Sequence, residues 1–114
     1  MQSHSAVRAL AALAQEHRLA VYRLLVQAGP EGMAAGAIAE ALAVPPSSMS
    51  FHLAQLANAG LVTQQRRSRS IVYSADYVAM NRLMGYLTEN CCGGEPCVVD
   101  ASCSPECGPE RDVA

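Results

Sequence analysis

Residues 44–56 read VPPSSMSFHLAQL, a double proline followed by a helical pattern of apolar residues. Two prolines end a preceding helix, whereas the second of them suits the first turn of a new helix, where its missing N–H is not needed. Met49, Leu53 and Leu56 then recur at the three- and four-residue spacing of one helix face. The segment therefore predicts a tight turn followed by a helix over about residues 46–58.

The sequence on either side of this turn predicts further helices and one hairpin. Helical spacing of apolar residues, β-type runs and glycine or proline breakers mark the elements. They are two helical stretches within residues 5–28, a short helix over 34–43, β-type runs at 61–65 and 70–74 around a polar turn at 66–69, and a last apolar helix over about 76–90. The fold class is thus mainly α with a small β-hairpin, and the order of elements predicts a winged helix-turn-helix.

Composition and charge limit the class of protein. The 114 residues suffice for one domain. The net charge of −2 argues against a nucleic-acid-binding protein, but its distribution does not. Residues 1–75 carry six Arg and three Glu (+3), whereas residues 76–114 carry two Arg and seven acids (−5). The body is therefore mildly basic, and all its cations are Arg, which forms forked contacts with phosphate.

The N-terminal apolar run is interrupted by charge at Arg8 and again at residues 16–18. This pattern predicts neither a signal peptide nor a membrane span, so we expect a cytoplasmic protein with no membrane partner. In that compartment thiols stay reduced, and clustered cysteines bind metal or sense redox state more often than they form structural disulfides.

Two sets of residues are candidates for DNA contacts. With the apolar face of the helix over 46–58 turned inward, five side chains of that helix face outward, namely Ser47, Ser48, Phe51, His52 and Gln55. The polar turn of the hairpin adds Arg66, Arg67 and Arg69. Alternatively, the helix is an ordinary amphipathic helix with Ser47 as its cap, and the arginine turn is simply solvated. The order of the elements favours DNA binding.

Four segments resemble the ArsR/SmtB family of winged-helix metal-responsive repressors. They are IAEAL at 38–42, the pattern SxxSxHLxxL at 47–56, GLV at 60–62 and the hairpin at 66–73, and the resemblance covers roughly residues 6–90. It implies a homodimer in which the first and last helices pair across the interface. It also implies binding to double-stranded, two-fold operator DNA that is released when an inducer binds.

All five cysteines lie between Cys91 and Cys107, behind the predicted last helix. The family's best-known arsenic site uses a Cys-x-Cys on the helix that precedes the DNA-recognition (reading) helix. In this chain the corresponding residues are Ile38 to Ala41, which include no thiol. The family's zinc-type site uses Asp and His on the last helix, which here offers Asp76 and Glu89 but no His. The inducer ligands are therefore expected in the C-terminal segment.

Cys91, Cys92 and Cys97 are the predicted metal ligands. Three soft thiolates suit a thiophilic ion, and trivalent arsenic or antimony takes three sulfurs in a pyramid. Because neighbouring helical residues point about 100° apart, the backbone must unwind near Cys91 for both adjacent sulfurs to converge, which Gly93 and Gly94 allow. The segment also resembles that of arsenic-responsive members of the family, which have Glu-Asn-Cys-Cys followed by a third Cys.

Other roles for these thiols remain open. Cys103 or Cys107 could complete a four-ligand site for zinc, cadmium or lead, or could be spare thiols. A disulfide between Cys91 and Cys92 would make a redox sensor. A thiol enzyme would need a thiolate of lowered pKa in a rigid pocket, and the acidic, glycine-rich surroundings and the absence of Cys-x-x-Cys argue against it. A metal-buffering protein would bind metal without an operator.

The sequence thus predicts two parts. Residues 1–90 form a winged helix-turn-helix domain for DNA binding and dimerisation, and residues 91–114 form a flexible cysteine-rich tail that carries the metalloid site. The expected function is that of a repressor released from DNA by As(III) or Sb(III), with neither catalysis nor an organic cofactor.

Overall fold

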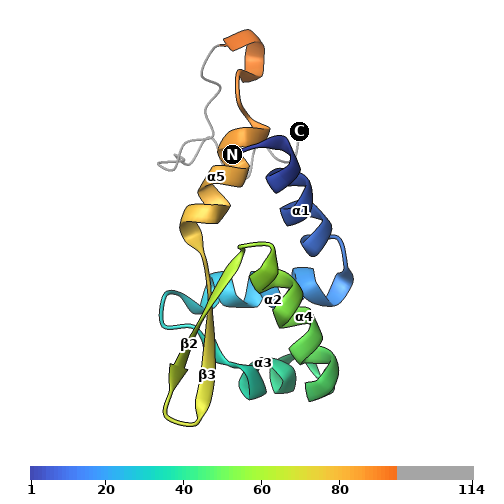
Figure 1. Ribbon diagram of the computed structural model, residues 1–114, viewed down its shortest axis with the longest axis vertical. Coiled ribbons are helices and arrows are strands. Elements are labelled where there is room, and N and C mark those ends of the chain that lie inside the picture. The colour runs from blue at the N-terminus through green and yellow to red at the C-terminus, as the bar shows by residue number, and fades with distance from the viewer. Residues whose placement is uncertain (95–114) are drawn as a thin grey trace, which may run out of the picture.

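The computed structural model describes residues 1–94, and the predictions for Cys97, Cys103 and Cys107 lie outside these residues. Within 1–94 the chain forms five α-helices, three strands and one 3-10 helix (Figure 1). Their bounds are α1 Ser3–Leu13, α2 Glu16–Ala28, β1 Met33–Ala34, α3 Ala35–Leu42, α4 Pro46–Asn58, β2 Val62–Arg67, β3 Ser70–Ala75, α5 Tyr77–Leu87 and η1 Cys91–Gly94. The predicted winged helix-turn-helix, mainly α with a small hairpin, is confirmed.

The helix-turn-helix consists of α3, α4 and the turn between them. Ala43 adopts a left-handed conformation (φ 55°), and the N–H of Val44 donates to the carbonyl of Ala39 at 3.0 Å, which closes the end of α3. Pro46 then occupies the first position of α4, as the sequence predicts. On α4 the residues Met49, Leu53 and Leu56 are buried. The predicted core face of α4 is therefore confirmed.

Gly60 ends α4 and directs the chain into the wing. Its φ of 80° is left-handed, and its N–H donates to the Ala57 carbonyl at 3.0 Å. The N–H of Leu61 donates to the Leu56 carbonyl at 3.0 Å, so the two bonds form a Schellman motif. Leu61 and Val62 are buried next to this turn, which fixes the start of β2 on the core.

The sheet has three antiparallel strands in the order β1-β3-β2. The hairpin of β2 and β3 is confirmed, but β1 was not predicted from the sequence. This strand has two residues, Met33 and Ala34, which pair with Tyr73 and Val72. Two residues are too few for a periodic pattern, so only the pairing with β3 identifies β1. The helix predicted to begin at residue 34 begins at Ala35, because Ala34 belongs to β1.

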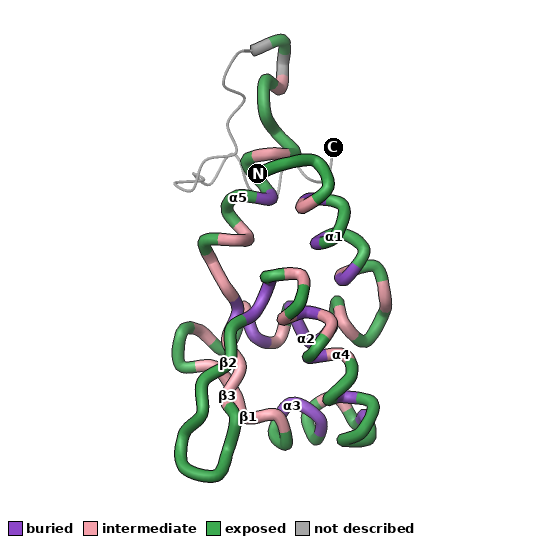
Figure 2. Tube along the Cα trace, in the orientation of Figure 1, coloured by how far each residue is buried: buried purple, intermediate pink, exposed green. Residues whose placement is uncertain are grey.

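The core lies between α2, α3, α4 and the base of the sheet, where Figure 2 shows the buried positions. Its largest fully buried side chains are Val21, Leu25, Ile38, Met49, Leu53, Leu56 and Leu61. Alanines of α1 and Leu83 of α5 belong to the same buried cluster, so both outer helices are anchored to the domain. The small alanine side chains let α1 lie close to its neighbours.

The elements at the two ends of the molecule differ, as Figure 1 shows. The tip of the β2–β3 hairpin and α3 lie at one end, whereas α1, α5 and η1 lie toward the other. Helix α5 starts with a cap, because the carboxylate of Asp76 accepts from the N–H of Ala79 at 3.1 Å. The hydroxyl of Tyr77 donates to the carbonyl of Val26 at 3.3 Å and ties α5 to α2.

Helix α5 ends at Leu87, so the predicted end near residue 90 is three residues too far. The hydroxyl of Thr88 donates to the Met84 carbonyl at 2.9 Å, and Asn90 adopts φ 58°, which no α-helix continues. None of the helices within residues 1–94 is long and apolar enough to cross a membrane.

Candidate nucleic-acid interface

The outward face of α4 contains the five predicted contact residues in two groups. Ser47, Ser48 and Phe51 are exposed. His52 and Gln55 are half-buried, because they turn partly toward α1 and α2. The structure thus brings only the first three onto the surface of α4 that is fully open to solvent.

The N-terminus of α4 has amide groups open to an acceptor. The N-cap is Pro45, and among the described residues no side chain accepts a hydrogen bond there. Ser47 lies inside the first turn, so the alternative that it caps the helix is wrong. The first N–H groups of a helix have no intrahelical acceptor and carry the positive end of the helix dipole. The start of α4 is therefore suited to an anionic oxygen such as a phosphate.

His52 is held by residues of α2. The guanidinium Nη1 of Arg18 lies 3.5 Å from Nδ1 of His52, and the rings of His17 and His52 are 5.5 Å apart. Burial first, and then the neighbouring His17 and Arg18, lower the pKa of the His52 imidazole. The lowered pKa favours the neutral ring, whose Nδ1 accepts from Arg18 when the ring proton is on Nε2. His52 therefore connects α4 to α2, and it also lies at the edge of the outward face of α4.

Gln55 lines a shallow cavity of about 310 Å³ between α1, α2 and α4. Arg8 lines this cavity, and its Nη2 donates to the Asn58 carbonyl at 2.7 Å. Arg18 borders the same cavity, and its Nε donates to the Ala12 carbonyl at 2.7 Å. Arg8 thus joins α1 to the C-terminal end of α4, and Arg18 joins the end of α1 to His52 of α4. No pattern in the sequence assigns them this part, because both bonds go to backbone carbonyls of distant segments.

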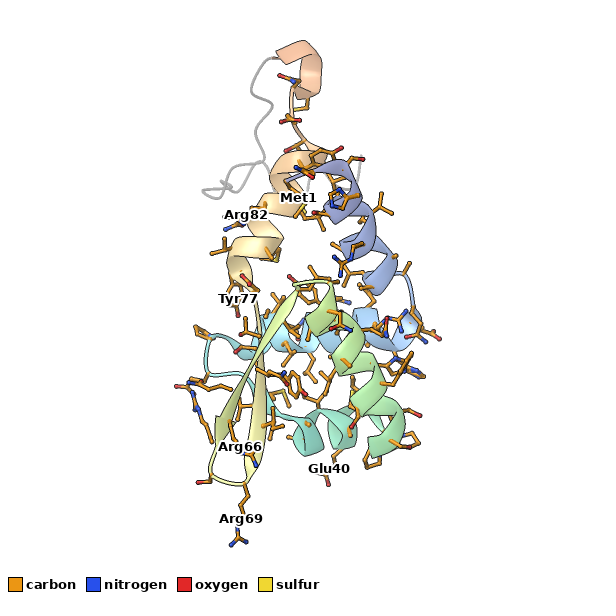
Figure 3. The ribbon with its side chains drawn as sticks, viewed as in Figure 1. Met1, Glu40, Arg66, Arg69, Tyr77 and Arg82 are labelled. Atoms are coloured by element: carbon orange, nitrogen blue, oxygen red, sulfur yellow. The ribbon has the colours of Figure 1, made fainter. Side chains whose placement is uncertain are left out.

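The wing presents three exposed arginines, but not in the predicted turn of four residues. Strands β2 and β3 extend to Arg67 and from Ser70, so Arg66 and Arg67 lie on β2 and only two residues form the turn. Successive strand residues point to opposite faces, so these two arginines diverge. Arg69 extends beyond the tip of the hairpin in Figure 3, which also labels Glu40 of α3 at this end. The guanidinium of Arg67 donates to the side chain of Gln65 at 3.1 Å.

Helices α1 and α5 expose apolar side chains at the other end. Val7 and Val78 are about three-fifths exposed (61 % and 59 %), and Met84 and Leu87 are 51 % and 54 % exposed. Leu10 of α1 is exposed as well. Exposed apolar residues gathered on two neighbouring helices are typical of an interface with another chain. The sequence prediction of an apolar last helix agrees with this surface.

The cysteine segment begins in the unwound chain after α5. Cys91 is half-buried in η1, and its N–H donates to the Thr88 carbonyl at 3.0 Å. The chain leaves the helical path at Asn90 (φ 58°), just before Cys91, whereas Cys91 to Gly94 form the helical turn η1, so the convergence of the two adjacent sulfurs stays a prediction. The backbone of Cys92 belongs to η1, whereas Cys97 lies outside the described residues. Within residues 1–94 no three His, Cys, Asp or Glu side chains converge on a metal position.

Comparison with known proteins agrees with this architecture. A helix-turn-helix domain family matches residues 13–65. Nodulation protein NolR of Rhizobium meliloti is 34 % identical over 80 residues, which are 70 % of this chain and 63 % of that protein. The chain therefore spans less than two thirds of the length of this relative.

Solved structures resemble the chain over most of its length. An ArsR-like transcriptional regulator from Rhodococcus sp. RHA1 has a TM-score of 0.66 and 27 % identity, over 74 % of this chain and 76 % of that one. NolR from Sinorhizobium fredii has a TM-score of 0.61 and 32 % identity, over 76 % and 84 %. The homodimeric winged helix-turn-helix domain Mb0332 from Mycobacterium bovis has a TM-score of 0.61 and 28 % identity, over 76 % and 81 %. The fold, the helix-turn-helix match and these similarities show that the chain belongs to the ArsR-like family of winged helix-turn-helix transcriptional regulators.

Proposed function

We propose that this regulator is a repressor that binds double-stranded operator DNA as a homodimer and leaves it when As(III) or Sb(III) binds its C-terminal thiolates. The observation that carries the proposal is the position of Cys91. It starts the 3-10 turn η1, which follows the end of α5 after three residues, and α5 is one of the two helices with an exposed apolar face. A ligand bound there acts on the helix that would join two chains.

Two arguments support binding to DNA through α4 and the wing. An α-helix fits the major groove, and the uncapped start of α4 can receive a phosphate oxygen. The exposed arginines of the wing lie on the hairpin that follows α4, and each phosphate that they neutralise releases counterions. The exposed carboxylate of Glu40 lies at the same end and reduces the attraction between this end and the DNA phosphates. The positive charges of the arginines at the hairpin tip therefore matter more for binding.

Replacing Arg69 with alanine is expected to weaken binding to all DNA sequences by a similar factor. The slope of log K against log salt concentration should become less steep by about 0.9 if one phosphate contact is lost. Fluorescence anisotropy of a labelled duplex between low and moderate salt measures this slope. Arg82→Ala is the matched control, because Arg82 lies on α5 far from the wing tip (Figure 3). An unchanged slope for Arg69→Ala would exclude the wing tip from the interface.

The apolar faces of α1 and α5 support a homodimer. Mb0332, which resembles this chain, is described as homodimeric. Leu87→Glu is expected to shift the mass in solution from that of two chains to that of one, because a carboxylate would be buried against a partner. Light scattering after size exclusion measures the mass. Leu19→Glu on α2, where the leucine is also exposed (46 %), should keep the dimer. Equal behaviour of the two variants would contradict an α1–α5 interface.

The donor set of the cysteine segment supports a trivalent metalloid. Cys91, Cys92 and Cys97 are thiols only, and soft thiolates prefer thiophilic ions. As(III) and Sb(III) need three sulfurs and no fourth ligand. A zinc site would need Cys103 or Cys107 as well, because zinc takes four ligands in a tetrahedron.

The contacts around α1 provide a route from the thiols to α4. Leu83 of α5 belongs to the same buried cluster as Ala6 and Ala9 of α1. Arg8 of α1 donates to the end of α4, and Arg18 links the end of α1 to His52. Metalloid capture would order the chain behind α5, shift α5 against α1, and so move the two reading helices of the dimer relative to each other. The two half-sites of the operator, whose spacing is fixed, then no longer fit both α4 helices of the dimer at once.

The test is release of operator DNA titrated with arsenite, antimonite, methylarsenite, cadmium and zinc. The upstream DNA of the chain's own gene serves as the probe in a gel-shift assay. Release by arsenite and antimonite at concentrations where cadmium and zinc have no effect is the expected result. Release by zinc or cadmium alone would assign the thiols to a four-ligand metal site. Binding of metal without any binding to DNA would make the chain a metal buffer and overturn the proposal.

A further inference from the structure

Phe51 stands out on the reading helix because it is large, apolar and 58 % exposed. The helix advances by about 100° per residue, which places Phe51 roughly opposite the buried Met49 and Leu53. Ser47 and Ala54 lie one turn before and one turn after it on nearly the same line. The ring is therefore at the centre of the surface that α4 would present to a groove.

The other exposed side chains of this surface have little capacity to distinguish bases. The exposed residues between the start of α4 and Ala54 are Pro46, Ser47, Ser48, Ser50, Phe51 and Ala54. Guanine is read in the major groove by a bidentate Arg or Lys, and adenine by a bidentate Asn or Gln. The exposed set contains none of these, and Gln55 is half-buried in the cavity with Arg8 and Arg18. Serine hydroxyls accept or donate to any base pair.

An apolar side chain has one specific partner in the major groove, the C5-methyl group of thymine. Ala54 is too short to extend beyond the neighbouring residues of α4, whereas the phenyl ring of Phe51 is the longest apolar side chain exposed there. Contact with a methyl group would remove apolar surface of both partners from water. Cytosine at the same position carries a hydrogen atom in place of the methyl group and an amino group in place of the O4 oxygen, so it would leave the ring without a partner.

The ring is also held in position before any DNA arrives. The Phe51 and His52 rings lie edge to face, with centroids 5.9 Å apart at 62°. His52 is in turn fixed by Arg18, which is anchored on the Ala12 carbonyl. A ring that is already ordered loses less side-chain entropy on binding than a free one. His52 is thus a positioning residue for Phe51.

We infer that Phe51 reads the C5-methyl group of one thymine in each operator half-site. The inference rests on the proposed binding of DNA by α4, and it adds the chemical group that the helix recognises. The preference arises from apolar contact, so it concerns a methyl group and not the hydrogen-bonding pattern of the base pair.

Substitution of thymine by deoxyuridine tests the inference, because it removes the methyl group and leaves base pairing unchanged. A duplex selected by the full chain from a randomised pool is synthesised with single T→U changes. Wild-type affinity should fall about four-fold at one thymine in each half-site, which corresponds to the free energy of about one buried methyl group. Phe51→Ala should bind the T and U duplexes equally at that position, while responses elsewhere stay unchanged.

Two further variants separate recognition from structure. Ser50→Ala, on the same exposed stretch of α4, should keep the four-fold preference for thymine. His52→Ala should reduce the preference without abolishing it, because the ring of Phe51 remains but is less ordered. Circular dichroism and mass in solution check that each variant stays folded and dimeric.

The possible failures are distinguishable. An enriched duplex that tolerates every T→U change, or a Phe51→Ala variant that keeps the wild-type preference, overturns the inference and leaves DNA binding intact. A pool in which nothing is enriched, with binding no stronger than to unselected DNA, overturns the proposed function and the inference together.

Discussion

Cys91→Ser and Cys92→Ser are each expected to keep operator affinity and to lose release by arsenite. A serine hydroxyl is a poor ligand for As(III), and two remaining thiolates do not complete a three-sulfur pyramid. The mutated positions lie behind α5, at the opposite end from the wing (Figure 1), so DNA contacts stay intact. Gel shifts of each variant with the upstream DNA, without and with arsenite, measure both properties.

Matched cysteine variants sharpen this result. Cys103→Ser and Cys107→Ser should respond to arsenite as the wild type does. Cys97→Ser should lose the response to arsenite but keep one to methylarsenite, which needs only two thiols. Retained release by arsenite in both Cys91→Ser and Cys92→Ser would rule out the C-terminal site.

The size of the effect follows from coupling. To move an operator from 99 % bound to 99 % free, the metalloid must favour the released state by roughly 5.5 kcal/mol. A dimer with two equivalent sites divides this requirement, so each site has to supply about half of it. A common allosteric coupling of about 1–3 kcal/mol per site is of the required order. Loss of one thiolate removes the whole coupling, because the ligand no longer binds.

The second large effect is expected for Gly32→Ala, which should lower the free energy of unfolding by about 3 kcal/mol or more. Gly32 has φ of 71°, and a Cβ atom there would collide with the carbonyl oxygen of Tyr73 and lie 3.1 Å from Val72 Cγ1. The collision is with the backbone of β3, which pairs with β1 directly after the glycine. Either the β1–β3 pairing opens or the wing shifts.

Two other glycines serve as controls for this variant. Gly60→Ala, at φ 80°, meets open space within the described residues and should cost only the left-handed strain of about 1–2 kcal/mol. Gly36→Ala, in α3 and also in open space there, should gain up to about 1 kcal/mol from helix propensity. Urea unfolding at one fixed protein concentration compares the three. A Gly32→Ala variant no less stable than Gly60→Ala would contradict the close approach of β1 and β3.

Local patterns were sufficient for the helix-turn-helix. The double proline, the spacing of Met49, Leu53 and Leu56, and Gly60 each act through a few neighbouring residues, so the sequence predicted α4 and its buried face correctly. The same holds for the hairpin of β2 and β3. These features depend on backbone preferences and helical period, which need no distant partner.

Features that depend on distant partners were predicted less well. Strand β1 has two residues and exists because of its pairing with β3. The end of α5 at Leu87 is a local feature that was also missed, because the apolar pattern continues past the Thr88 bond to Met84 and the left-handed Asn90. Arg66 and Arg67 belong to β2 because the ladder continues to Ser70, which only the register reveals.

Among the candidate DNA contacts, periodicity was enough to identify the outward side of α4, and the order of the elements was enough to place arginines in the wing. Only the tertiary structure separated the exposed Phe51 from the half-buried His52 and Gln55. The neighbours that cover these two are Arg8 and Arg18, more than thirty residues away along the chain. Their bonds to backbone carbonyls leave no trace in side-chain pattern, and packing of α1 and α2 against α4 therefore decides the shape of the reading surface.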